Sequence, residues 1–348
     1  DTALSANTTG LQNVAVGSGA MVANTDGNRN TAVGFQSLDA NTSGSDNISF
    51  GRRSLTLNTT GGNNAGLGTQ ALLLNTTGSS NTAIGIDALL SNTTASNNNA
   101  FGYQALYSNT TGTQNVGVGT YALYSNTTAS NVTAVGHRAG YGSTGNNLTA
   151  IGANAADATL TGGEVTAVGT QALTNNTTGG NNTAMGYLAL GANTTGAFNV
   201  ALGNYSLDAN VSGNNNTGLG YSSLSASTGG NNTAVGFQAL NLNTSASNNT
   251  AVGYSAGYAN TTGDIDAFGY IALQDNTTGA RNVAFGSRAL QNNTTGGDDV
   301  AVGKNALNDN ITGSSNTAVG YQSLYNNTAS YNTAVGDLSL HNNTTASD

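Results

Sequence analysis

Hydrophobic and polar residues follow one another in this chain in a pattern that returns every 16 or 17 residues. The copy at residues 30–46 reads Asn-Thr-Ala-Val-Gly-Phe-Gln-Ser-Leu-Asp-Ala-Asn-Thr-Ser-Gly-Ser-Asp, and Asn47 begins the next copy. We number the repeat from Asn30 as position 1, which makes Gly34 position 5 and Asp46 position 17. A repeat this short and regular is typical of a solenoid, in which each copy forms one coil that stacks on its neighbours.

The position-5 glycine occurs twenty times, and of the nineteen steps between copies fifteen are 17 residues and four are 16. Glycine tolerates backbone conformations and close approaches that other residues do not, so a glycine at this place indicates a bend after each strand. Examples of these turn glycines are Gly34, Gly51, Gly85 and Gly102. The pattern therefore predicts an all-β fold, a parallel β-solenoid (β-roll) of about twenty coils that occupies residues 1–348 as a single array.

Position 4 is apolar in every copy, and position 3 is always Ala, Gly or Ser. Successive residues of a strand face opposite sides, so we expect the large position-4 side chains to fill the coil and the small position-3 side chains to face a neighbouring chain. Positions 8 and 9 repeat the pair, mostly as Ala or Ser followed by Leu, although a short helical turn over positions 6–10 is an alternative. The predicted core residues are Val16, Val33, Phe50, Ile84, Phe101, Leu38, Leu72 and Leu106.

Positions 12–15 read Asn-Thr-Thr-Gly or a close variant, which is typical of a turn. Asparagines repeated at the spacing of stacked strands, about 4.8 Å, can form an amide ladder along the stack. The array begins at Asp1 in position 6 and ends at Asp348 in position 17, with no polar cap at either end. We therefore expect part of a longer fibre, a cleaved product, or a subunit that stacks end to end.

Composition narrows the possible partners. The net charge is −9 and the seven basic residues are scattered, which argues against nucleic-acid binding because that function needs clustered cations. There is no run of about 18 apolar residues, so we expect no membrane insertion. The absence of cysteine excludes disulfides and thiolate metal sites.

No catalytic constellation is apparent, and we expect no enzyme activity, cofactor or metal site. His137 and His341 lie twelve copies apart and cannot share a site within one chain. Glu164 and the pair Asp298-Asp299 are expected to be solvated surface acids, because acid–base catalysis needs carboxylates held at a defined separation. The Asn-Thr-Thr triplets match the N-glycosylation acceptor, but a turn favours the same residues, and whether they are glycosylated stays open.

Aromatic residues gather at positions 6 and 10 and are the candidates for contact with something outside the chain. Such rows could stack on sugar rings, but aromatic side chains also favour strand surfaces and packing between chains, and we prefer the second interpretation. A threonine column at position 2 raises ice binding as a minor alternative, although Ile48 and Asp266 interrupt it. The candidate contact residues are Phe35, Tyr103, Tyr107, Tyr187, Tyr221, Tyr254 and Tyr321.

The residues 316–328 (Asn-Thr-Ala-Val-Gly-Tyr-Gln-Ser-Leu-Tyr-Asn-Asn-Thr) and 102–112 resemble the repeat shafts of bacteriophage tail fibres. The segment Asn-Thr-Ala-Val-Gly is also similar to the head repeats of trimeric autotransporter adhesins, which are parallel β-rolls. The resemblance implies a homotrimeric fibre outside the cell, on a virion or a cell surface, whose shaft projects a receptor-binding tip. Alternatives are an adhesin module that binds host glycans or a surface receptor through its repeated side faces, and a self-assembling extracellular filament.

Overall fold

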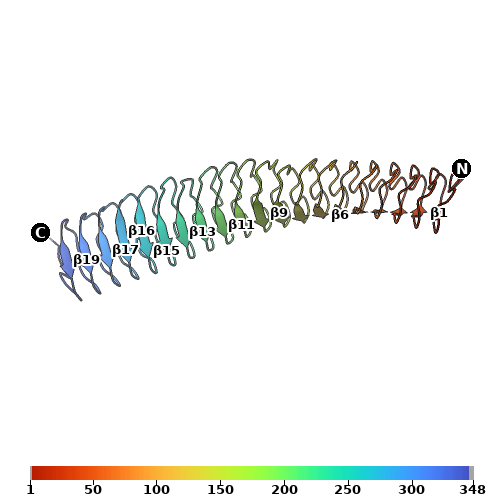
Figure 1. Ribbon diagram of the computed structural model, residues 1–348. Coiled ribbons are helices and arrows are strands. Elements are labelled where there is room, and N and C mark those ends of the chain that lie inside the picture. Colours follow the sequence, from red (N-terminus) through yellow and green to blue (C-terminus); the bar gives the residue numbers. More distant parts are fainter. Residues whose placement is uncertain (1, 345–348) are drawn as a thin grey trace. The chain divides into compact units, whose positions relative to one another are not determined.

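The computed structural model describes residues 2–344 of the 348-residue chain, so the expected places of Asp1 and Asp348 in the repeat lie outside the described residues. The chain divides into two compact units, residues 1–171 and 172–348. Each unit is a stack of coils, and each coil contributes one short strand (Figure 1). The predicted all-β solenoid is confirmed for the described residues.

The first unit contains ten strands, most of them three residues long. They are β1 (Val14–Val16), β2 (Thr31–Val33), β3 (Ile48–Phe50), β4 (Ala65–Leu67), β5 (Thr82–Ile84), β6 (Asn99–Phe101), β7 (Val116–Val118), β8 (Thr133–Val135), β9 (Leu148–Ile151) and β10 (Val165–Val168).

The second unit repeats this arrangement. Its strands are β11 (Thr183–Met185), β12 (Val200–Leu202), β13 (Thr217–Leu219), β14 (Thr233–Val235), β15 (Thr250–Val252), β16 (Ile265–Phe268), β17 (Asn282–Phe285), β18 (Val300–Val302), β19 (Thr317–Val319) and β20 (Thr333–Val335).

Within each unit, strands from successive coils pair in parallel, and every position pairs with the same position of the next coil. Thr31 of β2 lies opposite Ile48 of β3, and Val33 lies opposite Phe50. The register survives the shortened repeats, as the pairing of Thr133 with Thr149 across a 16-residue step shows. The missing residue is therefore absorbed by the loop, as a deletion in the turn predicts.

The inward and outward faces of the strand are the reverse of the prediction. Position-3 alanines such as Ala32 and Ala100 are completely buried, whereas the position-4 side chains face outward. Assigning Val16, Val33, Phe50, Ile84 and Phe101 to the core was therefore wrong. Val16 and Phe50 are more than half exposed (57% and 56%), Ile84 and Phe101 are more than a third exposed, and Val33 is partly exposed.

The position-9 leucine explains the reversal, because it fills the narrow interior. Leu38, Leu72 and Leu106 have no exposed surface, which confirms that part of the predicted core. Little room is left opposite the leucine. A Cβ added to Gly66, at position 3, would lie 2.5 Å from the Oγ of Ser54 and 3.4 Å from Leu55 Cδ1. Only a small side chain fits inward at position 3, so the large one at position 4 must point out.

Positions 6–10 form a turn and not the helical alternative. Gln36 and Leu38 have φ of 52° and 53°, in the left-handed region that non-glycine residues seldom occupy. Their N–H groups donate to neighbouring coils, Gln36 to the carbonyl of Ser18 (2.9 Å) and Leu38 to the carbonyl of Ser54 (3.0 Å). Backbone hydrogen bonds between coils thus continue beyond the strand.

Gly34 illustrates the need for glycine at position 5. Its φ is 135°, and a Cβ there would lie 2.5 Å from the carbonyl oxygen of Gly51 in the next coil. The same geometry recurs at Gly51, Gly85 and Gly102, so the predicted turn glycines are confirmed.

Buried asparagines complete the interior. The Nδ2 of Asn58, at position 12, donates to Asn41 Oδ1 of the preceding coil and to the Gly61 carbonyl of its own coil, both at 2.9 Å. This confirms the predicted amide ladder. A second ladder at position 1 was not predicted: Asn47 donates its N–H to Asn30 Oδ1 (3.0 Å) and its Nδ2 to the same Gly61 carbonyl (2.9 Å). Two asparagines therefore meet on one carbonyl oxygen.

Where position 9 lacks its leucine, position 1 of the next coil supplies the missing volume. Gly140 and Gly257 stand at position 9, and the following position-1 residues are Leu148 and Ile265 in place of Asn. A Cβ on Gly140 would lie 3.4 Å from Leu148 Cδ2, and one on Gly257 would lie 2.8 Å from Ile265 Cδ1. The interior volume is thus shared between adjacent coils.

The two strand faces can be separated by substitution in one coil. Leu55→Ala should lower the free energy of unfolding by about 2–5 kcal/mol, because it leaves a cavity in the interior. Phe50→Ala, on the outer face, should cost the unassembled chain less than about 1 kcal/mol. Chemical denaturation at low protein concentration measures both. Equal losses for the two variants would contradict the outward placement of position 4.

Candidate functional site

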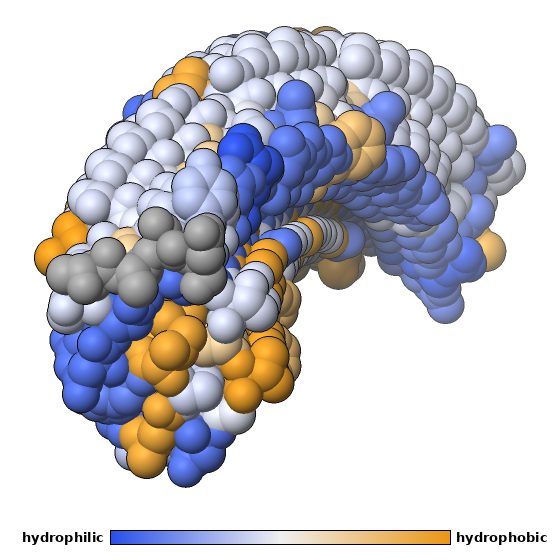
Figure 2. Space-filling model, turned by 90° about the vertical axis from the view of Figure 1, so that its left-hand side faces the viewer, coloured by the Kyte–Doolittle hydropathy of each residue, from blue (hydrophilic) through white to orange (hydrophobic). Residues whose placement is uncertain are grey.

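The outer face of the sheet is the first candidate surface, and we define it by positions 2 and 4. Its position-4 side chains are apolar in all twenty copies and stay at the surface. Figure 2 shows that side chains of similar hydropathy form bands from coil to coil. Contiguous exposed apolar surface commonly marks an interaction site.

Position 2 lies on the same face but lacks this uniformity. Thr31, Ile48, Ala65, Thr82 and Asn99 follow one another in five successive coils of the first unit. A surface that orders water requires a regular hydroxyl array, so this mixed column gives the ice-binding alternative no support. The apolar column at position 4 is what distinguishes the face.

The candidate aromatic residues of positions 6 and 10 lie on a second surface, the turn face, formed by positions 6, 7 and 10. In the second unit the rings of Tyr221, Phe237, Tyr254 and Tyr270 stack in succession, with centroids 5.4, 5.1 and 5.4 Å apart. The stacked rings face one another along the row, and each of the four side chains remains 41–50% exposed. This arrangement favours packing between coils over the stacking of sugar rings on free faces.

The first unit has a similar cluster of tyrosines. Tyr107, Tyr124 and Tyr141 stack at 5.1 Å spacings, and Tyr121 packs edge-on against Tyr103 at 5.4 Å. The structure therefore brings Tyr103 and Tyr107 into one cluster.

The other candidate aromatics have fewer ring neighbours. Tyr187 contacts Tyr205 edge-on at 5.3 Å. Phe35 and Tyr321 have no ring contact within residues 2–344, and about half of each side chain is exposed.

The two histidines belong to these aromatic rows. His137 packs edge-on against Tyr121 at 6.3 Å, and His341 stacks on Tyr325 at 5.1 Å. Among the described residues no group of three or more His, Cys, Asp or Glu side chains is placed to hold a metal ion. Nor do those residues include a helix with the length and apolarity of a membrane span.

Charged side chains form pairs on the surface. Arg29 binds Asp46 and Arg281 binds Asp298, each with Nε–Oδ1 distances of 2.6 Å. The hydrogen bond from each arginine holds the pKa of its aspartate below the ordinary value. Both pairs are exposed, as expected for Asp298, and such pairs contribute little to stability.

Asp299 is a correction to the sequence analysis, because it is completely buried. It stands at position 1, in the place of an asparagine of the second ladder. Its Oδ1 accepts hydrogen bonds from the N–H (2.8 Å) and Nδ2 (3.1 Å) of Asn316, and its Oδ2 accepts from Asn310 Nδ2 (3.1 Å). Burial raises its pKa to about 7, although the hydrogen bonds oppose the shift. The sequence did contain a signal for this burial, because an aspartate stands at a position that is asparagine in most other coils.

Stability should therefore depend on the protonation of Asp299. A carboxyl with a raised pKa binds its proton more tightly in the folded state, so stability falls as pH rises from about 4 to about 7, by at most about 4 kcal/mol. Asp299→Asn should remove most of this fall and raise the melting temperature at pH 8. Thermal unfolding between pH 4 and pH 8 measures the effect.

Asp298→Asn is the matched control, because it changes the exposed neighbour and should leave the pH dependence in place. If Asp299→Asn kept the full decrease in stability between pH 4 and pH 8, the buried carboxyl would not be its source.

The buried ladder also bears on the N-glycosylation acceptors. Asn75, at the start of an Asn-Thr-Thr triplet, is completely buried. Its Nδ2 donates to Asn58 Oδ1 (2.8 Å) and to the Gly78 carbonyl (2.9 Å). Both hydrogens of the amide are used, so a glycan on this nitrogen is incompatible with the folded coil.

Comparison of the chain with models of known protein families and with curated proteins finds no match.

Proposed function

We propose that this chain is the structural shaft of an extracellular fibre, on a virion or a cell surface, in which several copies pack through the outer face of the sheet. The observation that carries the proposal is the contrast between two columns on that face. Position 4 is apolar in every copy, whereas position 2 varies among Thr, Val, Ile, Ala, Asn and Asp. Nothing inside the coil requires an apolar side chain at an outward position, so a contact from outside accounts for the difference.

A second copy of the chain is the partner that suits this column best. The apolar side chains recur at the spacing of stacked parallel strands, about 4.8 Å. A partner can contact these side chains over many coils only if its own structure repeats at the same spacing. A second copy of the chain has this spacing. These side chains are already about half buried, so covering the rest of each contributes roughly half of the about 1.5–3 kcal/mol for complete burial, and this gain accumulates along each unit. A homotrimer buries the column of all three chains around one axis.

The role that follows is mechanical: the shaft holds a binding tip away from the particle or cell. A parallel stack suits this role because, within each unit, neighbouring coils are joined by backbone hydrogen bonds and most of them also by asparagine hydrogen bonds. Glycan binding through the aromatic rows is the weaker candidate, since the stacked rings already face one another from coil to coil.

Sedimentation velocity tests the assembly. The wild-type chain should sediment as an oligomer, and a triple variant Ile84→Glu, Phe101→Glu and Val118→Glu should dissociate, with association weakened at least about tenfold. Three carboxylates would otherwise be buried without partners.

A matched control places the same charges on another surface of the same coils. Thr94, Thr111 and Thr128 occupy position 14 of these coils and are exposed. Their replacement by Glu should leave the oligomer intact. A wild-type chain that stays monomeric at all concentrations would refute assembly through this face.

A further inference from the structure

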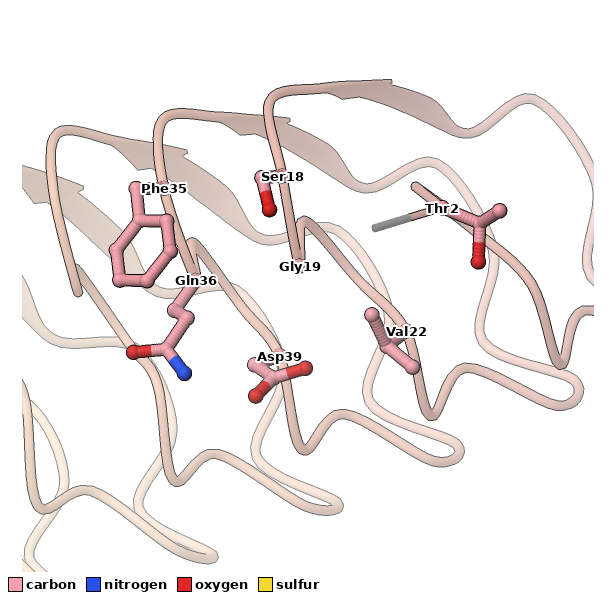
Figure 3. A pocket seen from close by; sticks show the side chains of 7 residues that line it. All are labelled: Thr2, Ser18, Gly19, Val22, Phe35, Gln36 and Asp39. Atoms are coloured by element: carbon pink, nitrogen blue, oxygen red, sulfur yellow. The ribbon is translucent and has the colours of Figure 1, made fainter.

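A hollow of about 440 Å³ opens on the turn face of the first unit (Figure 3). Its lining comes from positions 6, 7 and 10 of two successive coils, together with position 7 of the coil before them. The lining residues are Thr2, Ser18, Gly19, Val22, Phe35, Gln36 and Asp39.

Gly19 is the cause of the hollow. It occupies position 7, where the other coils carry a side chain, such as Gln36, Gln70 or Tyr121. The backbone is the same as in those coils, since φ is 69° at Gly19, 52° at Gln36 and 59° at Tyr121. The empty volume therefore lies where a position-7 side chain would lie.

Tyr121 shows what this place accommodates. Its ring centroid lies 5.8 Å from that of Tyr124 in the same coil, and 6.3 Å from each of His137 and Tyr141 in the next coil. These three residues stand at positions 10, 6 and 10, and the corresponding residues around Gly19 are Val22, Phe35 and Asp39. The hollow thus matches the surroundings of a tyrosine ring from which the ring has been removed.

Tyr205 provides a second example at position 7. Its ring packs edge-on against Tyr221, at position 6 of the next coil, with centroids 5.8 Å apart. Phe35 holds the position corresponding to Tyr221, and its side chain is half exposed with no ring beside it in the described structure. Phe35 therefore offers an edge or face to an incoming ring.

Asp39 determines the charge that the hollow favours. Burial raises the pKa of its carboxyl above the ordinary value. Within residues 2–344 its carboxylate takes part in none of the ion pairs, and Arg52 and Arg53 of the following coil do not line the hollow. A ligand with a positive charge would supply the missing partner.

We propose that the hollow above Gly19 binds a single aromatic ring that carries a cationic group. The ring occupies the place of the absent position-7 side chain, in contact with Val22 and Phe35, and the cation lies at Asp39. Ser18, Gln36 and Thr2 provide polar contacts at the edge. This site is separate from the sheet face through which the shaft assembles.

Tyramine is a suitable probe because it joins a phenol ring to an ammonium group. Titrated into the full chain and followed by calorimetry or ligand-observed NMR, it should bind with a dissociation constant on the order of 1 mM, as expected for a small ligand in a shallow site. 4-Hydroxyphenylacetate, which has the same ring with a negative charge, and ethylamine, which has the charge without the ring, should each bind at least about tenfold more weakly. No tyramine binding at 10 mM, or equal binding of ethylamine, would overturn the proposal.

Two variants at Gly19 test the location. Gly19→Tyr places the chain's own ring in the hollow, and Gly19→Gln restores the residue found at position 7 in several coils; each should weaken tyramine binding at least about tenfold. Gln238→Tyr adds the same ring at position 7 in the second unit and should leave binding unchanged. Melting temperatures establish that the variants fold, and unchanged affinity in either folded Gly19 variant would refute the site.

Asp39→Asn tests the role of charge. It should weaken tyramine binding about three- to tenfold while leaving the binding of phenol unchanged. Equal effects on both probes would refute a cation site at Asp39.

Discussion

The structure depends on hydrogen bonding inside a coil that is too thin to close around apolar side chains alone. Each regular coil buries one large apolar residue, the position-9 leucine, and two asparagines whose amides meet on the position-15 carbonyl. A buried amide left without partners costs about 1–3 kcal/mol. Stacking provides those partners, because each ladder asparagine needs the coil beside it. A single coil is therefore not expected to be stable without the coils stacked on it.

The points where this bonding fails lie at shortened repeats or beside them. Ser143 replaces the position-12 asparagine of a 16-residue coil, and its buried Oγ has no hydrogen-bond partner. The Oδ1 of Asn243, in the coil after another short repeat, is likewise without one. These coils should open more readily than those with complete ladders, because local stability follows the bonds that each segment forms.

The period alone predicted the solenoid, the parallel register, the turn glycines and the position-12 ladder, since these follow from the regularity of the repeat. The period did not predict which face of the strand points into the coil. Large residues at position 4 looked like core because size usually indicates burial, but the interior volume is decided by Leu38 and its equivalents, which reach across from another segment. The interior has room for only one of the two columns of large apolar residues, position 4 or position 9. The three-dimensional path of the turn decides which of them is buried.

The candidate surfaces were predictable to different degrees. The aromatic rows at positions 6 and 10 could be predicted from the repeat, but the stacking of their rings from coil to coil could not. The hollow at Gly19 depends on one missing side chain, which is visible only once position 7 is known to border the turn face. Asp299 was misjudged because acidic residues are usually exposed, and the second asparagine ladder that surrounds it had not been recognised.

Two kinds of constraint act on this repeat and leave different traces. Inside, the loss of a large apolar side chain in one coil can be balanced by the next coil, as Leu148 fills the space left by Gly140. Outside, position 4 shows no such exchange, because every copy is apolar whatever its neighbours carry. Val, Phe, Ile, Leu and Met are accepted there, so shape is not tightly specified, whereas polarity is. Tolerance of different shapes together with exclusion of charges and amides is the trace that the proposed apolar packing between copies of the chain would leave in the coils of each unit.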